Sequence, residues 1–547
     1  MVERKKEWWR GAVIYQVYPR SYQDSNGDGI GDLPGIARRL DHIASLGIDA
    51  VWLSPFFTSP MLDFGYDVSD YRDVDPMFGT LADFRALIAC AHALNLKVMI
   101  DLVLSHTSDQ HPWFKESRSS RDNPHAEWYV WADPKPDGTP PNNWLSLFGG
   151  SAWEWEARRK QYYMHNFLKQ QPDLNFHCPA VQDELLTIAR FWLDLGVDGF
   201  RLDTVNFYVH DKKLRDNPPA NRRDSFEIPL ANPYAWQDHL YDKTQPENLK
   251  FLERLRGVMN EYGDIASVGE VGDGERALQT MAAYAEGEKR LSMCYSFDLL
   301  SRSFGKDHVA RTIREFERVA GKSWGCWAFS NHDVERHVSR WAEFAPDPES
   351  FGRFCIALLV CLRGTICIYQ GEELGLPEAD VPFELLQDPY GKQFWPEFKG
   401  RDGCRTPIPW EAKARNAGFS TAEHPWLPVP GSHYTHAAAI DGEPNPATLT
   451  ADYRRLIALR HAHPALMTGS IALRETPGAL LAFTREGGSE RLLCLFNFGK
   501  VPASFDIPAG ENLNTLEGAA TGAVIETRKV SLTAGGFIIT QLETLGA

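Results

Sequence analysis

The sequence of 547 residues predicts an α/β fold: a (β/α)8 TIM barrel with a subdomain inserted after its third strand and an all-β domain at its C-terminus. Three observations lead to this prediction. Short apolar runs rich in β-branched and aromatic residues recur, amphipathic stretches separate them, and closely spaced strands follow near the C-terminus. Strands that alternate with helices form parallel sheets, and eight such units fit a closed barrel better than an open sheet.

The barrel strands are expected where these apolar runs occur. Segments such as LPGIARRLDHIASLG and DHVARTIREFERVAG lie between the runs and repeat apolar residues at helical spacing. In chain order, the expected strands are residues 12–18, 49–54, 97–103, 198–203, 265–270, 293–298, 326–330 and 366–371.

Two connections are too long for ordinary loops between a strand and a helix. Residues 107–176 are rich in Trp, Pro, Asn and Tyr and predict an inserted domain, whereas residues 204–246 predict a lid-like excursion. The barrel should therefore comprise residues 1–106 and 177–466. Residues 467–547 carry short, closely spaced apolar runs and predict a C-terminal β-sandwich domain.

The composition argues against several classes of function. A net charge of −16 repels phosphate backbones, which disfavours nucleic-acid binding. No apolar stretch reaches the roughly 18 residues that span a bilayer, and the first residues lack the apolar core of a signal peptide. The nine cysteines include no CxxC pair, so neither a disulfide framework nor a zinc site is indicated. We expect a cytoplasmic protein that acts on a small molecule, either as a monomer or as a homodimer.

Acidic residues follow three of the predicted strands. Asp203, Glu270 and Asp333 lie at the ends of the fourth, fifth and seventh strands, and the C-terminal strand ends of a barrel surround one mouth. A single acidic residue at a strand end is most often a cap or a solvated turn. Three of them at one mouth, beside Arg201 and two histidines, are costly to bury unless a substrate or a reaction uses them.

Paired carboxyl groups predict a particular chemistry. In glycoside hydrolysis, one carboxylate attacks the sugar and a second carboxyl group donates a proton to the leaving group. Arg201 and Asp203 lie two residues apart and point to the same face of the strand, so the guanidinium should keep Asp203 ionised. Glu270 follows an apolar strand and has anionic neighbours, which should raise its pKa toward that of a general acid.

Several motifs resemble a known family. DLVLSH (101–106), GFRLDTVN (199–206), VGEV (268–271) and FSNHD (329–333) resemble the four signature regions of the α-amylase family of glycoside hydrolases. QPDLN (171–175) resembles the extra signature of the family's oligo-1,6-glucosidase and α-glucosidase branch. MLDFGYDVSDY, FGGSAW and YYMHNF are similar to that branch too, so the resemblance runs from about residue 8 to the C-terminal domain.

This resemblance implies the parts of a pocket. Asp203 would be the nucleophile, Glu270 the acid/base, and Asp333 the third carboxylate, which grips sugar hydroxyl groups and favours the distorted ring. Asp63 and Arg401 match the ion pair that closes the subsite of exo-acting members, so the pocket should receive one non-reducing glucose. The other matching positions are Tyr66, which would stack on the glucose, His106, Arg201 and His332, which would hydrogen-bond it, and Phe148, Phe167, Gln171 and Phe297, which would line the pocket and the leaving-group subsite.

Simpler structural interpretations exist for some of these residues. His106 and His332 could be core histidines whose ring nitrogens are satisfied by the backbone. The three phenylalanines could serve packing alone, and Arg401 could form a surface ion pair.

Thr204, which follows the expected nucleophile, carries information on the linkage. The resemblance implies that Val at this position accompanies α-1,6 linkages and that Thr accompanies α-1,4 linkages. Thr204 therefore favours α-1,4 bonds.

The stretch DSNGDGIGD (24–32) alternates oxygen-bearing side chains with glycines. It is not an EF-hand, because Gly35 occupies the position that requires a bidentate Glu, and it lacks the GK[ST] of a phosphate loop. The remaining interpretations are an oxygen cage for a hard cation and a cluster of Asx turns. Members of the resembling branch carry a cation there, which implies one structural Ca²⁺ or Mg²⁺ ion held by Asp24, Asn26, Asp28, the Ile30 carbonyl and Asp32.

These observations predict a retaining, exo-acting α-glucosidase that releases glucose from short α-glucosides and also transfers it to acceptor hydroxyl groups. An alternative is a transglucosidase or a sucrose-acting glucosyltransferase or isomerase on the same scaffold, although the RLDRD-like loop of sucrose isomerases is not evident. A scaffold or sugar-binding protein without catalysis is a third hypothesis. The three retained carboxylates and the lack of a membrane anchor count against it.

Overall fold

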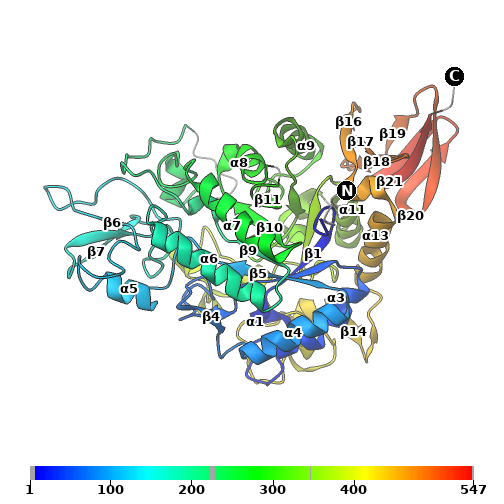
Figure 1. Cartoon of the computed structure of the whole chain (residues 1–547). Helices are drawn as coiled ribbons and strands as arrows, with labels where there is room; N and C mark the ends of the chain where they lie inside the picture. Colours follow the sequence, from blue (N-terminus) through cyan, green and yellow to red (C-terminus); the bar gives the residue numbers. More distant parts are fainter. Residues whose placement is uncertain (1–6, 222–227, 287, 345–346, 545–547) are drawn as a thin grey trace.

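Eight parallel strands form the centre of the molecule (Figure 1). The computed structural model describes residues 7–221, 228–286, 288–344 and 347–544. Each barrel strand predicted from the sequence is present and overlaps its expected range. The strands are β1 Val13–Val17, β2 Ala50–Leu53, β5 Lys97–Leu102, β9 Gly199–Leu202, β10 Ala266–Val271, β11 Met293–Ser296, β12 Cys326–Ala328 and β13 Thr365–Tyr369.

The sheet closes on itself. The strands are hydrogen-bonded in the order β11-β10-β9-β5-β2-β1-β13-β12, and every pairing between neighbours is parallel. An isolated parallel bridge between Cys294 and Gly325 joins the two ends of this order. Because helices cover the outside and side chains fill the inside, all residues of β1, β2 and β9 are buried. The predicted TIM barrel is confirmed.

Helices pack around the barrel and begin at recognisable caps. Helix α4, for example, starts with a capping box between Thr80 and Asp83. The stretch LPGIARRLDHIASLG, expected as one helix, is two helices, because Arg39 leaves helical geometry (φ −111°, ψ 6°) and separates α2 from α3. The helices are α1 Pro19–Tyr22, α2 Leu33–Arg38, α3 Leu40–Ser45, α4 Leu81–Ala93, α5 Pro112–Ser117, α6 Pro179–Asp194, α7 Asn248–Tyr262, α8 Ala277–Tyr284, α9 Lys306–Ala320, α10 His337–Arg340, α11 Pro348–Cys361, α12 Pro389–Phe394, α13 Thr450–Ala462 and α14 Pro464–Thr468.

The segment 107–176 carries its own small sheet. Strands β6 (Trp131–Ala132), β8 (Gln161–Met164) and β7 (Trp153–Glu156) pair antiparallel in that order. An isolated bridge between His106 and Asp173 holds the two ends of the segment together beside the barrel. Two short strand pairs lie elsewhere in the chain: β3 Phe57–Thr58 with β4 Asp70–Val74, and β14 Ala439–Ile440 with β15 Glu443–Pro444.

The excursion 204–246 contains little regular structure. Its described residues include two 3-10 turns, η1 (Val205–Phe207) and η2 (Pro233–Trp236). Residues 222–227 of the predicted excursion lie outside the described residues.

The C-terminal domain is an antiparallel sheet beyond α13, at the right of Figure 1. Its strands are hydrogen-bonded in the order β16-β17-β18-β21-β19, and β20 also pairs with β21. Within the described residues, no helix has both the length and the apolar character needed to cross a membrane. The strands are β16 Ser470–Arg474, β17 Leu480–Gly487, β18 Glu490–Asn497, β19 Ala503–Asp506, β20 Glu511–Glu526 and β21 Lys529–Thr544.

Candidate active site

Arg201, on β9, lies at the centre of the predicted site. The guanidinium is fully buried, and its Nη1 lies 2.6 Å from Asp203 Oδ1 and 2.8 Å from Asp101 Oδ1. Its Nη2 lies 2.7 Å from Glu270 Oε2. The structure therefore brings Asp203 and Glu270 together as neighbours on one guanidinium, as a carboxyl pair about 5 Å apart requires. We call Arg201, Asp101, Asp203, Glu270 and Tyr295 the nucleophile cluster.

The same guanidinium contacts both predicted catalytic groups, and this corrects one expectation. Burial raises the pKa of Glu270 to about 7, with Arg201 opposing the shift, in the predicted direction. Burial also raises the pKa of Asp203 to about 7, because desolvation outweighs the attraction of Arg201. The expectation that Arg201 keeps Asp203 ionised is therefore not met, because burial outweighs the guanidinium.

Thr204 connects the two carboxyl groups further. Its backbone lies in the left-handed region (φ 40°, ψ 47°), an uncommon and strained conformation for a β-branched residue. There, its amide N–H donates to Glu270 Oε2 at 3.0 Å and its hydroxyl donates to Asp203 Oδ2 at 3.3 Å. The Thr204 hydroxyl is also 3.1 Å from the Ser105 hydroxyl. The strained turn thus lets Thr204 donate hydrogen bonds to both carboxyl groups.

Asp333 belongs to a second group of charges. Its Oδ1 lies 2.9 Å from Arg405 Nη2 and 3.2 Å from Arg401 Nη1, and its Oδ2 lies 3.2 Å from His332 Nε2. Burial raises the pKa of Asp333, but His332 and the two arginines outweigh burial and hold that pKa well below its usual range. Asp333 is therefore a permanent carboxylate at neutral pH.

Arg401 joins Asp333 to the predicted closing pair. Its Nη2 lies 2.8 Å from Asp63 Oδ1 and 2.8 Å from Asp388 Oδ1. The Gln171 amide donates to Asp63 Oδ2 at 3.1 Å. Asp63 and Arg401 thus form the expected ion pair, and it is buried instead of lying on the surface. We call Arg401, Asp63, Asp333, Asp388 and Arg405 the pocket-end cluster.

The two histidines and Tyr66 lie between these clusters. Tyr66 stacks on the His332 ring with centroids 5.5 Å apart, and its hydroxyl is hydrogen-bonded to His332. His106 Nε2 lies 2.9 Å from the Tyr66 carbonyl oxygen and 3.2 Å from Gln171 Nε2. Burial lowers the pKa of His106 to about 4, so its ring is neutral, and it lowers that of His332 below its usual value, with Asp333 opposing the shift. The backbone contact of His106 agrees with the simpler interpretation and leaves its role toward a sugar a prediction.

The predicted aromatic residues divide into two places. Phe148 and Phe167 pack with Phe207 and Tyr390 in one buried cluster. Phe297, after β11, packs instead at the edge of the barrel interior near Tyr295, with ring centroids 6.4 Å apart. Phe297 is thus not part of the aromatic cluster.

Asn232 fastens three segments over this aromatic cluster. Its side-chain amide donates to the Leu147 carbonyl at 2.7 Å and to the Tyr390 hydroxyl at 3.2 Å. Tyr390 stacks on Phe148 at 4.8 Å, and the Arg401 guanidinium lies 5.2 Å from the centre of the Phe148 ring. The excursion, the inserted domain and the segment after β13 that contains Tyr390 therefore meet beside the pocket-end cluster.

Sequence reasoning missed several residues of the site. Asp101 and Tyr295 lie within strands, whereas the rule applied to the sequence selects residues at strand ends. The Tyr295 hydroxyl donates to Glu270 Oε1 at 3.0 Å. Inward-facing polar residues in otherwise apolar strands were the available signal. Asp388, Tyr390 and Arg405 lie in the long segment after β13, where no spacing rule applied.

The loop 24–32 folds as a set of Asx turns. Asp24 accepts hydrogen bonds from the amides of Asn26, Gly27 and Gly29, and Asp32 caps α2 by accepting from the Gly35 amide. The atoms that the predicted ligands of this loop would offer to a metal ion are all oxygens, which suits Ca²⁺ or Mg²⁺. Nevertheless, within 7–221, 228–286, 288–344 and 347–544, no three His, Cys, Asp or Glu side chains are grouped to hold a metal ion. The cation at this loop stays a prediction.

A barrel mouth with paired carboxyl groups on neighbouring strands defines the class of glycoside hydrolases that work through two carboxyl groups. Residues 16–469 match the family model for the alpha amylase catalytic domain. The chain belongs to the α-amylase family.

Relatives cover nearly its whole length. A probable alpha-glucosidase of Rhizobium meliloti (strain 1021) is 58% identical over 99% of this chain and 98% of its own, and an oligo-1,6-glucosidase of Heyndrickxia coagulans is 37% identical over 92% and 94%. Among solved structures, the alpha-glucosyl transfer enzyme XgtA is 52% identical with a TM-score of 0.93, covering 98% of this chain and 99% of its own. The trehalulose synthase MutB from Pseudomonas mesoacidophila MX-45 is 34% identical with a TM-score of 0.87, covering 98% and 99%.

Proposed function

We propose that this protein is a retaining, exo-acting α-glucosidase that releases α-glucose from the non-reducing end of short α-glucosides and prefers α-1,4 linkages. One observation carries the proposal: the pair Asp203 and Glu270 shares Arg201, while the buried pair Asp63 and Arg401 lies at the other cluster. An ion pair that closes one end of the site would admit one terminal glucose. The names of the relatives, alpha-glucosidase and oligo-1,6-glucosidase, support the same class of substrate.

The reaction would proceed in two displacements. Asp203 attacks the anomeric carbon while Glu270 gives its proton to the leaving oxygen, and a glucosyl ester forms on Asp203. Glu270, now ionised, takes a proton from water or from an acceptor hydroxyl, which attacks the ester. Asp333, a permanent carboxylate, accepts hydrogen bonds from sugar hydroxyl groups during both steps.

Transfer to sugar acceptors is the second part of the proposal. The solved relative XgtA is named an alpha-glucosyl transfer enzyme. The closely packed excursion around Asn232 supports such a role, because an ordered leaving-group side can hold an acceptor in place of water. A sucrose-acting isomerase is the alternative that the likeness to MutB supports.

Proton NMR of the reaction tests the proposal. With maltose, isomaltose, sucrose and trehalose as substrates, we expect α-glucose as the first anomer released, fastest from maltose, with new glucosidic linkages at high substrate. Initial β-glucose would contradict retention. Conversion of sucrose to an isomer without release of glucose would favour the alternative.

We also propose one structural cation at the loop 24–32, held by Asp24, Asn26, Asp28, Asp32 and the Ile30 carbonyl. Binding to the folded state alone raises the unfolding temperature. Thermal unfolding with Ca²⁺, Mg²⁺ or a chelator tests this, with Asp28→Asn as the variant. An unfolding temperature that no cation changes would contradict it. The nine cysteines, all unpaired, support our proposal of a cytoplasmic protein, and the net charge of −16 supports one that binds no nucleic acid.

A further inference from the structure

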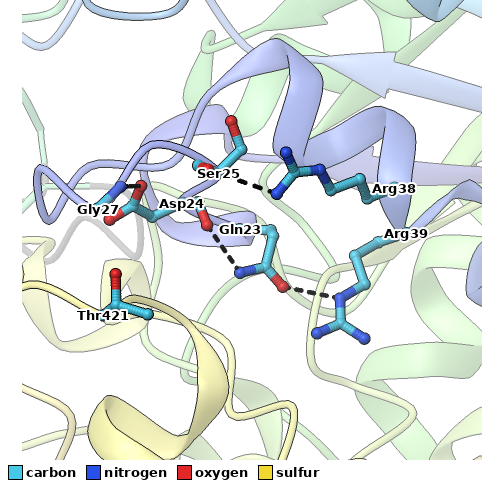
Figure 2. A pocket seen from close by; sticks show the side chains of 7 residues that line it. All are labelled: Gln23, Asp24, Ser25, Gly27, Arg38, Arg39 and Thr421. Atoms are coloured by element: carbon cyan, nitrogen blue, oxygen red, sulfur yellow. Dashed lines mark hydrogen bonds between the residues drawn. The ribbon is translucent and has the colours of Figure 1, made fainter.

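We propose that the protein has a second binding site, for a phosphate group, at the junction of α2 and α3 and outside the active site. The site is a cavity of about 430 Å³ (Figure 2). Its wall brings together the loop that follows α1, the helix junction and a segment near residue 421. The lining residues are Gln23, Asp24, Ser25, Gly27, Arg38, Arg39 and Thr421.

Arg39 is fixed in one orientation at this cavity. Its Nε donates to Gln23 Oε1 at 2.7 Å, and its guanidinium lies 4.5 Å from the centre of the Trp410 ring. Gln23 is itself held, because its amide nitrogen donates to the Asp24 carbonyl at 3.0 Å and the Phe419 carbonyl at 2.7 Å. Within the part of the chain that the structure describes, the two terminal nitrogens of Arg39 have no hydrogen-bond acceptor. They form a fork whose plane is set before any ligand binds.

The two arginines at this cavity form no ion pair with the described residues. Neither Arg38 nor Arg39 forms an ion pair with a carboxylate of the described residues, although the chain carries a net charge of −16. Burial lowers the pKa of Arg39, with Tyr22 opposing the shift. Desolvating a cation without a counter-ion is costly, so the arrangement is better explained by an anionic ligand than by stability.

Asp24 also lines the cavity, but its carboxylate is turned to the loop and forms no ion pair with Arg38 or Arg39. One of its carboxylate oxygens accepts from the Asn26 amide at 3.0 Å and the Gly27 amide at 2.7 Å. The other accepts from the Gly29 amide at 2.8 Å and from the Ser420 hydroxyl at 2.5 Å. These hydrogen bonds from the loop and from Ser420 fix the orientation of the carboxylate.

The donors suit a phosphate group. A guanidinium fork binds two oxygens of an oxyanion at once. Arg38 makes only a long contact, 3.4 Å, with the Ser25 carbonyl, and the Thr421 hydroxyl has no partner among the described residues, so both can serve further oxygens. Phosphate offers three such oxygens, whereas a carboxylate offers two. The cavity volume leaves room for a small organic group on the phosphate.

Calorimetric titration with inorganic phosphate, and separately with glucose 6-phosphate, tests the site. In a buffer with chelator, we expect saturable binding with one site per chain and unchanged turnover of maltose at saturating phosphate. Arg39→Met should weaken binding at least about tenfold, because it removes the fork. The control Arg314→Met, which removes an exposed charge on α9, should bind as the parent does. Tighter, Arg39-dependent binding of the ester would identify phosphate esters as the ligand, and equal binding would identify free phosphate.

Three results would overturn the proposal. The first is no saturable binding of phosphate up to about 10 mM, a concentration beyond weak small-ligand affinities. The others are equal affinity of Arg39→Met and the parent for phosphate, and phosphate binding only when Ca²⁺ or Mg²⁺ is present. Unchanged turnover of maltose by Arg39→Met shows that the variant folds. If Arg39→Met fails to fold, Thr421→Val is the second variant and should weaken phosphate binding while the control does not. Equal affinity of Thr421→Val and the parent would then count against the site.

Discussion

The nucleophile cluster and the pocket-end cluster are both built around buried arginines, yet they shift the pKa values of Glu270 and Asp333 in opposite directions. Arg201 is shared among Asp101, Asp203 and Glu270, and burial keeps the pKa values of the latter two at about 7. At the other cluster, two arginines converge on Asp333 and hold its pKa far below the usual range. Burial dominates the pKa values of Asp203 and Glu270, whereas the neighbouring His332, Arg401 and Arg405 outweigh burial at Asp333.

This difference in pKa values indicates different roles for the two clusters in the proposed reaction. Groups that gain and lose a proton near neutral pH can serve as acid and base, whereas a group that stays ionised can only attract and orient. The nucleophile cluster is thus suited to bond making and breaking. The pocket-end cluster is suited to holding one sugar.

The largest effect should follow from Asp203→Asn, which removes the proposed nucleophile. We expect turnover of maltose to fall by about 10⁴-fold or more, because no other group can form the glucosyl ester. Sugar binding, measured by calorimetry with glucose, should remain. The control Asp183→Asn, at an exposed position on α6, should keep full activity. Loss of binding along with turnover would mean that the two clusters do not divide the tasks.

Glu270→Gln should separate the acid step from attack. We expect about 10²- to 10⁴-fold lower kcat/KM on maltose and a much smaller loss on aryl glucosides whose leaving group needs no proton. In the parent, Glu270 is protonated below its pKa of about 7, so kcat/KM on maltose should fall as pH rises through about 7. The pH profile of the variant on an activated substrate should lack that fall. An equal loss on both substrates would contradict the acid role.

Asp63→Asn should test the pocket end alone. It breaks one charged contact of Arg401 but leaves the nucleophile cluster intact, so we expect kcat/KM to fall about 10²-fold through KM, with the pH profile unchanged. Initial rates on maltose and maltotriose measure this. The surface pair Asp380 and Lys399 provides the control, since Asp380→Asn should change neither parameter. A shifted pH profile in Asp63→Asn would show that the clusters are not separable.

The smallest effect concerns acceptor choice. Asn232→Ala removes the hydrogen bonds to Leu147 and Tyr390, worth about 1 kcal/mol, so the ratio of transfer to hydrolysis should drop about fivefold. Product analysis at high maltose measures that ratio. Asn143→Ala is the control, because it removes two hydrogen bonds with Asn217, between the inserted domain and the excursion, without touching the aromatic cluster. An equal ratio of transfer to hydrolysis in Asn232→Ala and Asn143→Ala would show that Asn232 does not favour transfer.

The sequence predicted the barrel well because its strands are short, apolar and separated by helices, and strand ends are where charged residues stand out. It located Asp203, Glu270 and Asp333 by that rule. It mispredicted the protonation of Asp203, since a two-residue spacing reveals an Arg neighbour but not the burial that raises the pKa of Asp203. Asp388 and Arg405 lie in a long loop whose path depends on tertiary packing, so no local pattern could place them.

The central claim is that Asp203 becomes covalently linked to the sugar. Incubation with 5-fluoro-α-glucosyl fluoride, followed by proteolysis and mass spectrometry, would capture that ester. We predict one fluoroglucosyl group per chain on the peptide that contains Asp203. A label on Glu270 or Asp333, or turnover of the reagent with no ester formed even in Glu270→Gln, would contradict the account.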